Sequence, residues 1–190
     1  MAYQLKISLD DSSKPPIWRK VLVPGTFTFH ELHAVIQAVM GWENGHLYAF
    51  RPDGRRGEDI GIPFDDDFMG VETIDARKTP IRKYLIRDKQ KVAYEYDFGD
   101  GWAHTVLVEK ITEDKMTAPH CLGGKGACPP EDCGGIYGYY GLVEAVNDPK
   151  HPEHEDMREW LGLEKGELWD VHAFDASACQ QEIIHYQQYI

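Results

Sequence analysis

The chain has 190 residues, of which 42% are hydrophobic and five are tryptophan, enough to bury a sizeable core without disulfides. Its formal net charge is −12, and residues 119–190 carry most of the imbalance, with 13 Asp/Glu against 4 Lys/Arg. An acidic surface repels a phosphate backbone, so bulk nucleic-acid binding is disfavoured and we expect the partner to be a protein or a small ligand.

The sequence contains no pattern typical of a membrane protein or a secreted protein. No run approaches the roughly 18 apolar residues that a membrane span needs. The first residues, MAYQLKISLDD, lack the basic start and apolar centre of a signal peptide. We therefore expect a cytoplasmic protein without membrane association.

The first forty residues predict two strands and a helix. Residues 3–9 alternate apolar and polar side chains, as a strand with one buried face does. Residues 17–23 predict a second strand, antiparallel to the first because the connection is too short for a crossover helix. Thr28 and Glu31 form the capping box of a helix that Gly41 is suited to end.

The next segment is less regular. Residues 46–50 predict a short strand, and residues 51–70 predict a long irregular loop rich in Gly, Pro and Asp. Within this loop, Asp65–Asp67 carry the carboxylate oxygens that a hard cation prefers, but they lack the ligand spacing of a calcium loop, so we do not expect a calcium site there. Basic side chains here, such as Arg55 and Arg56, are interpreted as solvated charges. Residues 81–86 predict another strand.

Residues 94–111, YEYDFGDGWAHTVLVEKI, predict a β-hairpin. Asp100-Gly101 is a preferred pair for a two-residue type I′ turn, and this turn would place Asp97 directly opposite His104. A three-residue loop over residues 99–101 would instead place His104 opposite Tyr96.

The polar residues of this region form the candidate binding site His46, Asp97, Asp100 and His104. A carboxylate beside a histidine can fix the imidazole tautomer, support a metal ligand or activate a general base. It can equally be a cross-strand polar pair that stabilises the sheet by roughly 0.2–1 kcal/mol. The sequence leaves both interpretations open, and a metal site further requires His46 to approach the hairpin.

A loop rich in Gly, Pro and Cys follows the hairpin. Cys121, Cys128 and Cys133 are spaced C-x6-C-x4-C, with His120 next to the first of them. Three thiolates and a histidine suit tetrahedral zinc, the possible cofactor. The loop lacks a CxxC pair, so buried structural cysteines are the favoured interpretation and zinc ligands are the alternative.

The last third predicts helices near residues 137–146, 153–161 and 175–189. Glu131 and Asp132 precede the first of these and are interpreted as favourable charges at its N-terminus. Strands first and helices last indicate an α+β fold with a largely antiparallel sheet. We expect a single domain over residues 1–190, with strands and one capped helix in 1–118 and the cysteine loop and helices in 119–190.

Four segments carry a resemblance to a known family: IWRKV (17–21), MGWENGHLYAF (40–50), residues 94–111 and PPEDCGGIYGY (129–139). In this order along nearly the whole chain, they resemble the plasmid Ri ORF-3-like family. Its members are often labelled as passengers of insertion elements or as TnpR resolvases, and some resemble modules fused to a repressor-type DNA-binding domain. The family has no established activity, so the resemblance implies no catalytic residue.

The resolvase label does not fit the residues of this chain. A serine recombinase needs a nucleophilic serine among arginines that stabilise the developing phosphate charge. The serines are Ser8, Ser12, Ser13 and Ser177, and no arginine precedes residue 19. We therefore exclude resolvase activity and leave open whether the protein is an enzyme.

Two functions remain. The first is a non-enzymatic binding module that serves mobile-element or regulatory machinery. The alternative is a metal-dependent hydrolase or nuclease-like enzyme, in which His46, Asp97, Asp100 and His104 hold a metal that activates water. A structural zinc in the cysteine loop is compatible with either.

Overall fold

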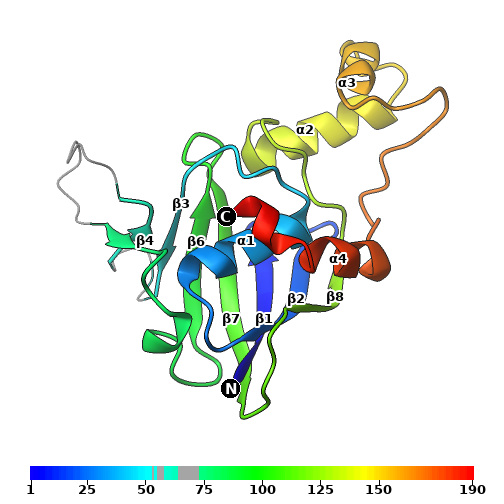
Figure 1. Cartoon of the computed structure of the whole chain (residues 1–190). Helices are drawn as coiled ribbons and strands as arrows, with labels where there is room; N and C mark the ends of the chain where they lie inside the picture. The colour runs from blue at the N-terminus through cyan, green and yellow to red at the C-terminus, as the bar shows by residue number, and fades with distance from the viewer. Residues whose placement is uncertain (53, 55–57, 64–72) are drawn as a thin grey trace.

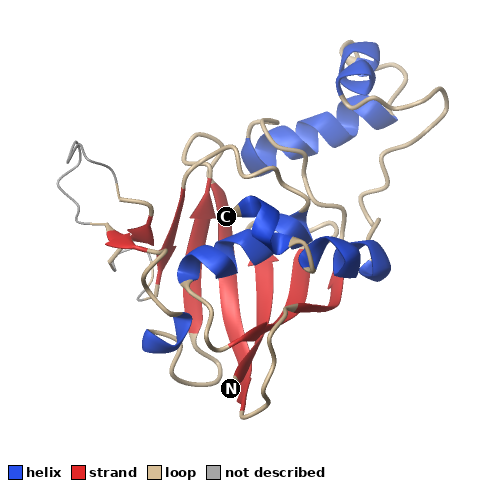
Figure 2. Cartoon of the chain, in the orientation of Figure 1, coloured by secondary structure: helices blue, strands red, loops and turns tan. Residues whose placement is uncertain are grey.

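The computed structural model describes residues 1–52, 54, 58–63 and 73–190 and shows one sheet with helices across one face (Figures 1 and 2). The eight strands lie in the order β5-β4-β3-β6-β7-β1-β2-β8, antiparallel except for the β4–β5 pair. The strands are β1 (Ala2–Leu9), β2 (Trp18–Pro24), β3 (Tyr48–Arg51), β4 (Ile60–Gly61), β5 (Ile74–Asp75), β6 (Lys91–Tyr96), β7 (Trp102–Thr112) and β8 (His120–Lys125). This arrangement confirms the predicted α+β class with a largely antiparallel sheet.

Four α-helices accompany the sheet: α1 (Phe29–Met40), α2 (Gly135–Asn147), α3 (His154–Trp160) and α4 (Ala176–Ile183). Two 3-10 turns, η1 (Ile81–Lys83) and η2 (Tyr186–Tyr189), complete the described elements. Figure 1 shows α1 and α4 across the sheet, whereas α2 and α3 extend from one corner. Within the part of the chain that the structure describes, no helix has the length and apolar content to cross a membrane.

Helix α1 begins and ends as its sequence predicts. The Thr28 hydroxyl accepts a hydrogen bond from the Glu31 amide at 3.2 Å, and the Thr28 amide donates to the Glu31 carboxylate at 2.7 Å. Gly41 takes the left-handed conformation, with φ of 78°, that a C-terminal glycine provides at little cost. The capping box and the end of the helix are therefore confirmed.

The register of the β6–β7 hairpin differs from both predicted registers. His104 pairs with Tyr94 and Trp102 pairs with Tyr96, so residues 97–101 form a longer connection. The two-residue turn would have placed Tyr94 and Tyr96 on the opposite face from Trp102 and Val106. The observed register instead buries all of these on one face, and the hydrophobic pattern overrides the local turn preference of Asp-Gly.

Two other predictions are corrected. Residues 81–86 contain the 3-10 turn η1 in place of a strand. The predicted cysteine loop begins as strand β8, which pairs with β2 at the edge of the sheet. Arg55, Arg56 and Asp65–Asp67 lie outside the described residues.

Candidate metal-binding site

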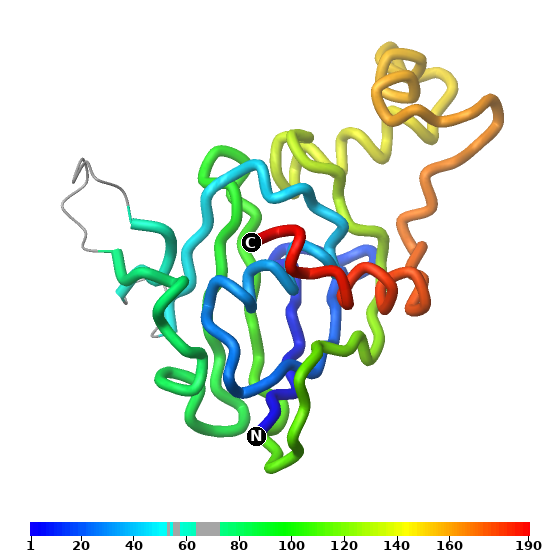
Figure 3. Tube along the Cα trace, in the orientation of Figure 1, coloured from blue at the N-terminus to red at the C-terminus, as the bar shows by residue number. Residues whose placement is uncertain are grey.

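Three loops meet at one end of the sheet: 41–47 after α1, 97–101 between β6 and β7, and 126–134 before α2 (Figure 3). Each loop contributes one side chain to a cluster formed by His46, Asp97 and Asp132. His46 Nε2 lies 3.0 Å from Asp132 Oδ1, and His46 Nδ1 lies 3.8 Å from Asp97 Oδ1. One potential ligand atom from each residue lies within 4.8 Å of the other two.

Backbone pairing explains why His46 meets Asp97. Strand β3 pairs with β6 so that Tyr48 lies opposite Tyr96, and the ladder continues as the Asp97 amide donates to the Leu47 carbonyl at 2.8 Å. Asp97 then turns with φ of 54°, a left-handed conformation that aspartate tolerates better than most residues. Its Oδ1 accepts from the Gly99 amide at 2.9 Å, which fixes the carboxylate beside His46.

Glu131 ties the third loop to the other two. One carboxylate oxygen accepts from the Tyr96 hydroxyl, and the other accepts from the Glu43 amide at 2.8 Å. Burial, together with this bond to Glu131, raises the pKa of Tyr96 above its ordinary value, so the phenol stays a donor. Trp42 Nε1 adds a bond to the Pro129 carbonyl at 2.9 Å. Asp132 therefore extends from a loop that is held on both sides.

Asp100 supports the site without belonging to the cluster. Its Oδ2 accepts from the Gly134 amide at 3.0 Å. At Gly135, an added Cβ would lie 2.3 Å from the Asp100 carbonyl oxygen, so only glycine permits this approach of the two loops. The predicted site residue Asp100 is thus a contact that positions the loop of Asp132.

A second network fixes the loop of His46. Asn44 Nδ2 donates to the Tyr189 carbonyl at 2.8 Å, so its Oδ1 accepts from His33 Nε2 at 2.7 Å. His33 Nδ1 is then the acceptor for the Tyr94 hydroxyl at 2.8 Å. Burial lowers the pKa of His33 to about 3, which keeps this imidazole neutral.

The three clustered side chains differ in exposure, and they open onto solvent. The Asp97 side chain is 11% exposed, His46 is 35% exposed and Asp132 is 69% exposed. A pocket of about 390 Å³ adjoins them, lined by Gly45, His46, Leu47, Asp97, Phe98 and Gly99. A cation held here would keep coordination positions free for water or a ligand.

The chemistry of the cluster suits a borderline cation such as zinc. Imidazole nitrogen and carboxylate oxygen both bind zinc at roughly 2.0–2.2 Å, so ligand atoms around a tetrahedral ion are roughly 3.3 Å apart. The 3.0 Å separation involves His46 Nε2 and the 3.8 Å separation involves His46 Nδ1, so the ring or a carboxylate would have to move for one nitrogen and both carboxylates to hold the same ion. Three protein ligands with an open fourth position are typical of zinc sites that bind water or substrate.

His104 does not belong to this site. Its ring is buried between Trp42 and Tyr94, and Nδ1 bonds to the Trp102 carbonyl at 2.9 Å. Nε2 has no hydrogen-bond partner among the described residues. Burial lowers the pKa of His104 to about 4, so the imidazole is neutral. The predicted Asp97–His104 pair is wrong, because the observed register places His104 on the buried face.

The cysteines and His120 are not brought together as the predicted zinc ligands. His120 and Cys121 lie on strand β8, where neighbouring side chains point to opposite faces. Burial raises the pKa of Cys128 and of Cys133 to about 12, so both thiols are protonated in this structure. Among the described residues, His46, Asp97 and Asp132 form the one group of three or more potential ligands within reach of each other.

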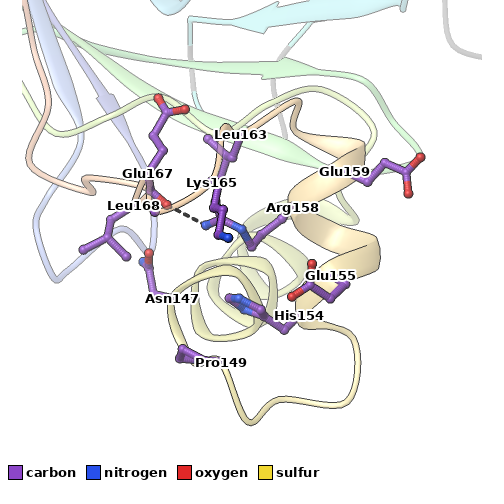
Figure 4. A pocket seen from close by; sticks show the side chains of 11 residues that line it. Asn147, Pro149, His154, Glu155, Arg158, Glu159, Leu163, Lys165, Glu167 and Leu168 are labelled. Carbon is purple, nitrogen blue, oxygen red and sulfur yellow. Dashed lines mark hydrogen bonds between the residues drawn. The ribbon is translucent and has the colours of Figure 1, made fainter.

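A larger pocket, of about 730 Å³, lies between the end of α2, helix α3 and the segment 163–168 (Figure 4). Its polar side chains hold the chain that surrounds it. Arg158 donates to the carbonyls of Glu164 and Glu167, and His154 Nδ1 bonds to the Ala145 carbonyl at 2.8 Å. The polar groups that line the pocket therefore hold the surrounding loops in place, and we assign them a structural role.

Asp132 is the member of the cluster that the sequence patterns do not indicate. Its position before a helix predicts a favourable charge at the helix N-terminus, whereas the structure gives it φ of 59° and places its carboxylate 3.0 Å from His46. A signal was available: the segments GWENGH, YDFGDG and PPEDCGG each place an ionisable side chain within two residues of a glycine. Only the meeting of the three loops shows which of these side chains act together.

Known proteins are similar to this chain over most of its length. The plasmid pRiA4b ORF-3-like protein family matches residues 1–178. An uncharacterized protein of Sinorhizobium fredii, y4hQ, is 40% identical over 162 residues, which cover 84% of this chain and 80% of that protein. The crystal structure of a protein of unknown function from Methanosarcina mazei is 36% identical, with a TM-score of 0.77 over 93% of this chain and 95% of the other. The chain therefore belongs to the plasmid pRiA4b ORF-3-like protein family.

Proposed function

We propose that the protein is a metal-dependent binding module in which His46, Asp97 and Asp132 hold a divalent cation, with zinc the best chemical match. The observation that carries this proposal is the convergence of one imidazole and two carboxylates from three separate loops within 4.8 Å. Close approach of two carboxylates is unfavourable unless a positive charge lies between them. A bound cation would provide that charge, as would a charged His46 ring, which lies between the two carboxylates.

The neighbouring carboxylates favour binding over hydrolysis. A zinc hydrolase needs a general base within hydrogen-bond reach of the metal-bound water. Glu131 accepts from Tyr96 and Glu43, and Asp100 accepts from Gly134, so both carboxylates already have structural roles. His104 is buried and is no candidate for the base.

The rim of the site indicates the kind of ligand. Leu47 and Phe98 are exposed by 40% and 49% beside the cluster. A cation with open positions binds a carboxylate or phosphate oxygen, and the two apolar side chains would contact a hydrophobic group next to it. We infer that the site binds a protein segment or a small ligand that carries both a carboxylate or phosphate group and a neighbouring hydrophobic group. The plasmid ORF-3-like description of the family is compatible with a role in mobile-element or regulatory machinery, which we include in the proposal.

Zinc titration by calorimetry tests the metal site. The full chain should bind one zinc, and Asp132→Asn should weaken binding at least about tenfold, because the amide lacks the anionic charge of the ligand. Asparagine tolerates the left-handed conformation of residue 132, so the fold should be kept. Asp114→Asn is the matched control, since Asp114 is an exposed aspartate beyond the far end of β7. Equal zinc affinity in all three proteins would contradict the proposal.

A metal-dependent hydrolase remains the second candidate, because three protein ligands leave a position for water. Turnover of ester or phosphodiester substrates by the zinc-loaded chain, lost in Asp132→Asn and kept in Asp114→Asn, would favour it. Zinc binding without turnover would favour the binding module.

A further inference from the structure

Two thiols lie side by side where the C-terminal helix meets the edge of the sheet. Cys121 lies on β8 opposite Val21, and Cys179 lies in the first half of α4. The two side chains lie close enough for each to shift the pKa of the other, and β8 and α4 are in contact. The adjoining Gln180 fixes this contact, because its Oε1 accepts from the Cys121 amide at 2.9 Å. The pair therefore joins segments that are far apart in the chain.

The two thiols also differ in a way that suits sequential reaction. Cys121 is partly exposed, whereas Cys179 is buried. The neighbouring Cys179 side chain, aided by the nearby Arg19 charge, lowers the pKa of Cys121, and the same contact together with burial raises the pKa of Cys179. Cys121 is thus the accessible nucleophile and Cys179 the second thiol, while Cys128 and Cys133 keep raised pKa values near 12.

We propose that Cys121 and Cys179 form a reversible disulfide that links β8 to α4, with a low-molecular-weight disulfide as the oxidant. The Cys121 thiolate attacks one sulfur of the oxidant, forms a mixed disulfide and releases a small thiolate. Cys179 loses its proton, attacks the Cys121 sulfur and releases the second small thiolate. Two protein thiols are oxidised, and one small disulfide is reduced to two thiols.

A disulfide between Cys121 and Cys179 would affect the C-terminal segment that contains α4 and η2. Helix α4 and turn η2 lie across α1, and the Tyr189 carbonyl accepts from Asn44 in the loop of His46 (Figure 3). A bond from residue 121 to residue 179 would anchor this segment covalently and restrict the unfolded chain between them. We therefore expect the oxidised protein to melt at a higher temperature than the reduced protein.

Treatment of the full chain with oxidised glutathione, followed by mass spectrometry and thiol titration, tests the proposal. The reduced chain has four free thiols, and oxidation should leave two, with the loss of two hydrogen atoms and one cross-linked peptide containing residues 121 and 179. Dithiothreitol should restore all four. Four free thiols after treatment, or a bond between residues 128 and 133, would overturn the proposal.

Cysteine-to-serine variants distinguish the nucleophile Cys121 from the second thiol, Cys179. Cys179→Ser should trap Cys121 as a stable glutathione adduct, because the thiol that resolves it is gone. Cys121→Ser should form neither the cross-link nor a rapid adduct. Cys128→Ser is the matched control and should form the cross-link as the natural chain does. An adduct of Cys179→Ser at any other cysteine would contradict the assignment of Cys121 as the nucleophile. None of these outcomes depends on the proposed zinc site.

Discussion

At the scale of single residues, the environment decides what a histidine can do. His46 is one third exposed between two carboxylates and can bind a cation. His33 and His104 are buried among aromatic rings and stay neutral. The sequence made His46 and His104 equal candidates, because it shows residue types and spacing but not burial.

The buried histidines predict an acid-dependent loss of stability. Burial holds the pKa of folded His104 near 4, below the ordinary value of 6.5, so the unfolded chain binds the proton more readily. The stability that this difference provides is complete above about pH 6.5 and is lost as the pH falls towards 4. Between about pH 7 and pH 5, His104 should account for a loss of about 2 kcal/mol in the free energy of unfolding.

Urea unfolding of the natural chain and of His104→Phe at these two pH values measures the effect. Phenylalanine keeps an aromatic ring between Trp42 and Tyr94 but removes the titrating group. The pH dependence should shrink by about 2 kcal/mol in the variant. The same pH dependence in both proteins would exclude this role for His104.

At the scale of elements, the site depends on the close approach of two loops. The β6–β7 loop meets the N-terminus of α2 where the Asp100 carbonyl passes Gly135. Gly135 also has φ of 69°, so an alanine here would meet both a steric clash and an unfavourable backbone conformation. The loops carry Asp97 and Asp132, so their spacing sets the geometry of the cluster.

Gly135→Ala should therefore lower the free energy of unfolding by more than about 1 kcal/mol and weaken zinc binding. Gly141→Ala is the control within α2, because an added Cβ there meets nothing within 4 Å and alanine favours helix. Urea unfolding and zinc calorimetry check both variants. If the two substitutions have equal effects, the approach of the loops does not constrain the site.

At the scale of the whole molecule, the C-terminal segment completes the core. Helix α1 is buried at nearly every position, including polar His33 and Gln37, because the sheet covers one side and α4 with η2 covers the other (Figure 1). A helix with an apolar stripe predicts one buried face. The second buried face arises from residues about 150 positions further along the chain.

Tyr186 tests this arrangement. Its buried ring packs against Phe27 at a centroid distance of 5.2 Å. Tyr186→Ala should lower the free energy of unfolding by about 3 kcal/mol, since it leaves a cavity under η2. Tyr137→Ala, at a side chain that is 82% exposed, should change it by less than about 0.5 kcal/mol. Thermal or urea unfolding compares the two, and similar losses would show that the C-terminal segment adds little to the core.

The sequence by itself determined several local elements and the family. The capping box of α1, its C-terminal glycine and the alternating pattern of β1 depend on interactions between residues that are close in the chain. The sequence alone is therefore enough to predict them. The register of β6 and β7 and the partners of His46 were decided by the tertiary structure. Burial of Tyr94, Tyr96 and Trp102 on one face outweighed the turn preference of Asp100-Gly101, and three distant loops had to meet before Asp132 could join Asp97.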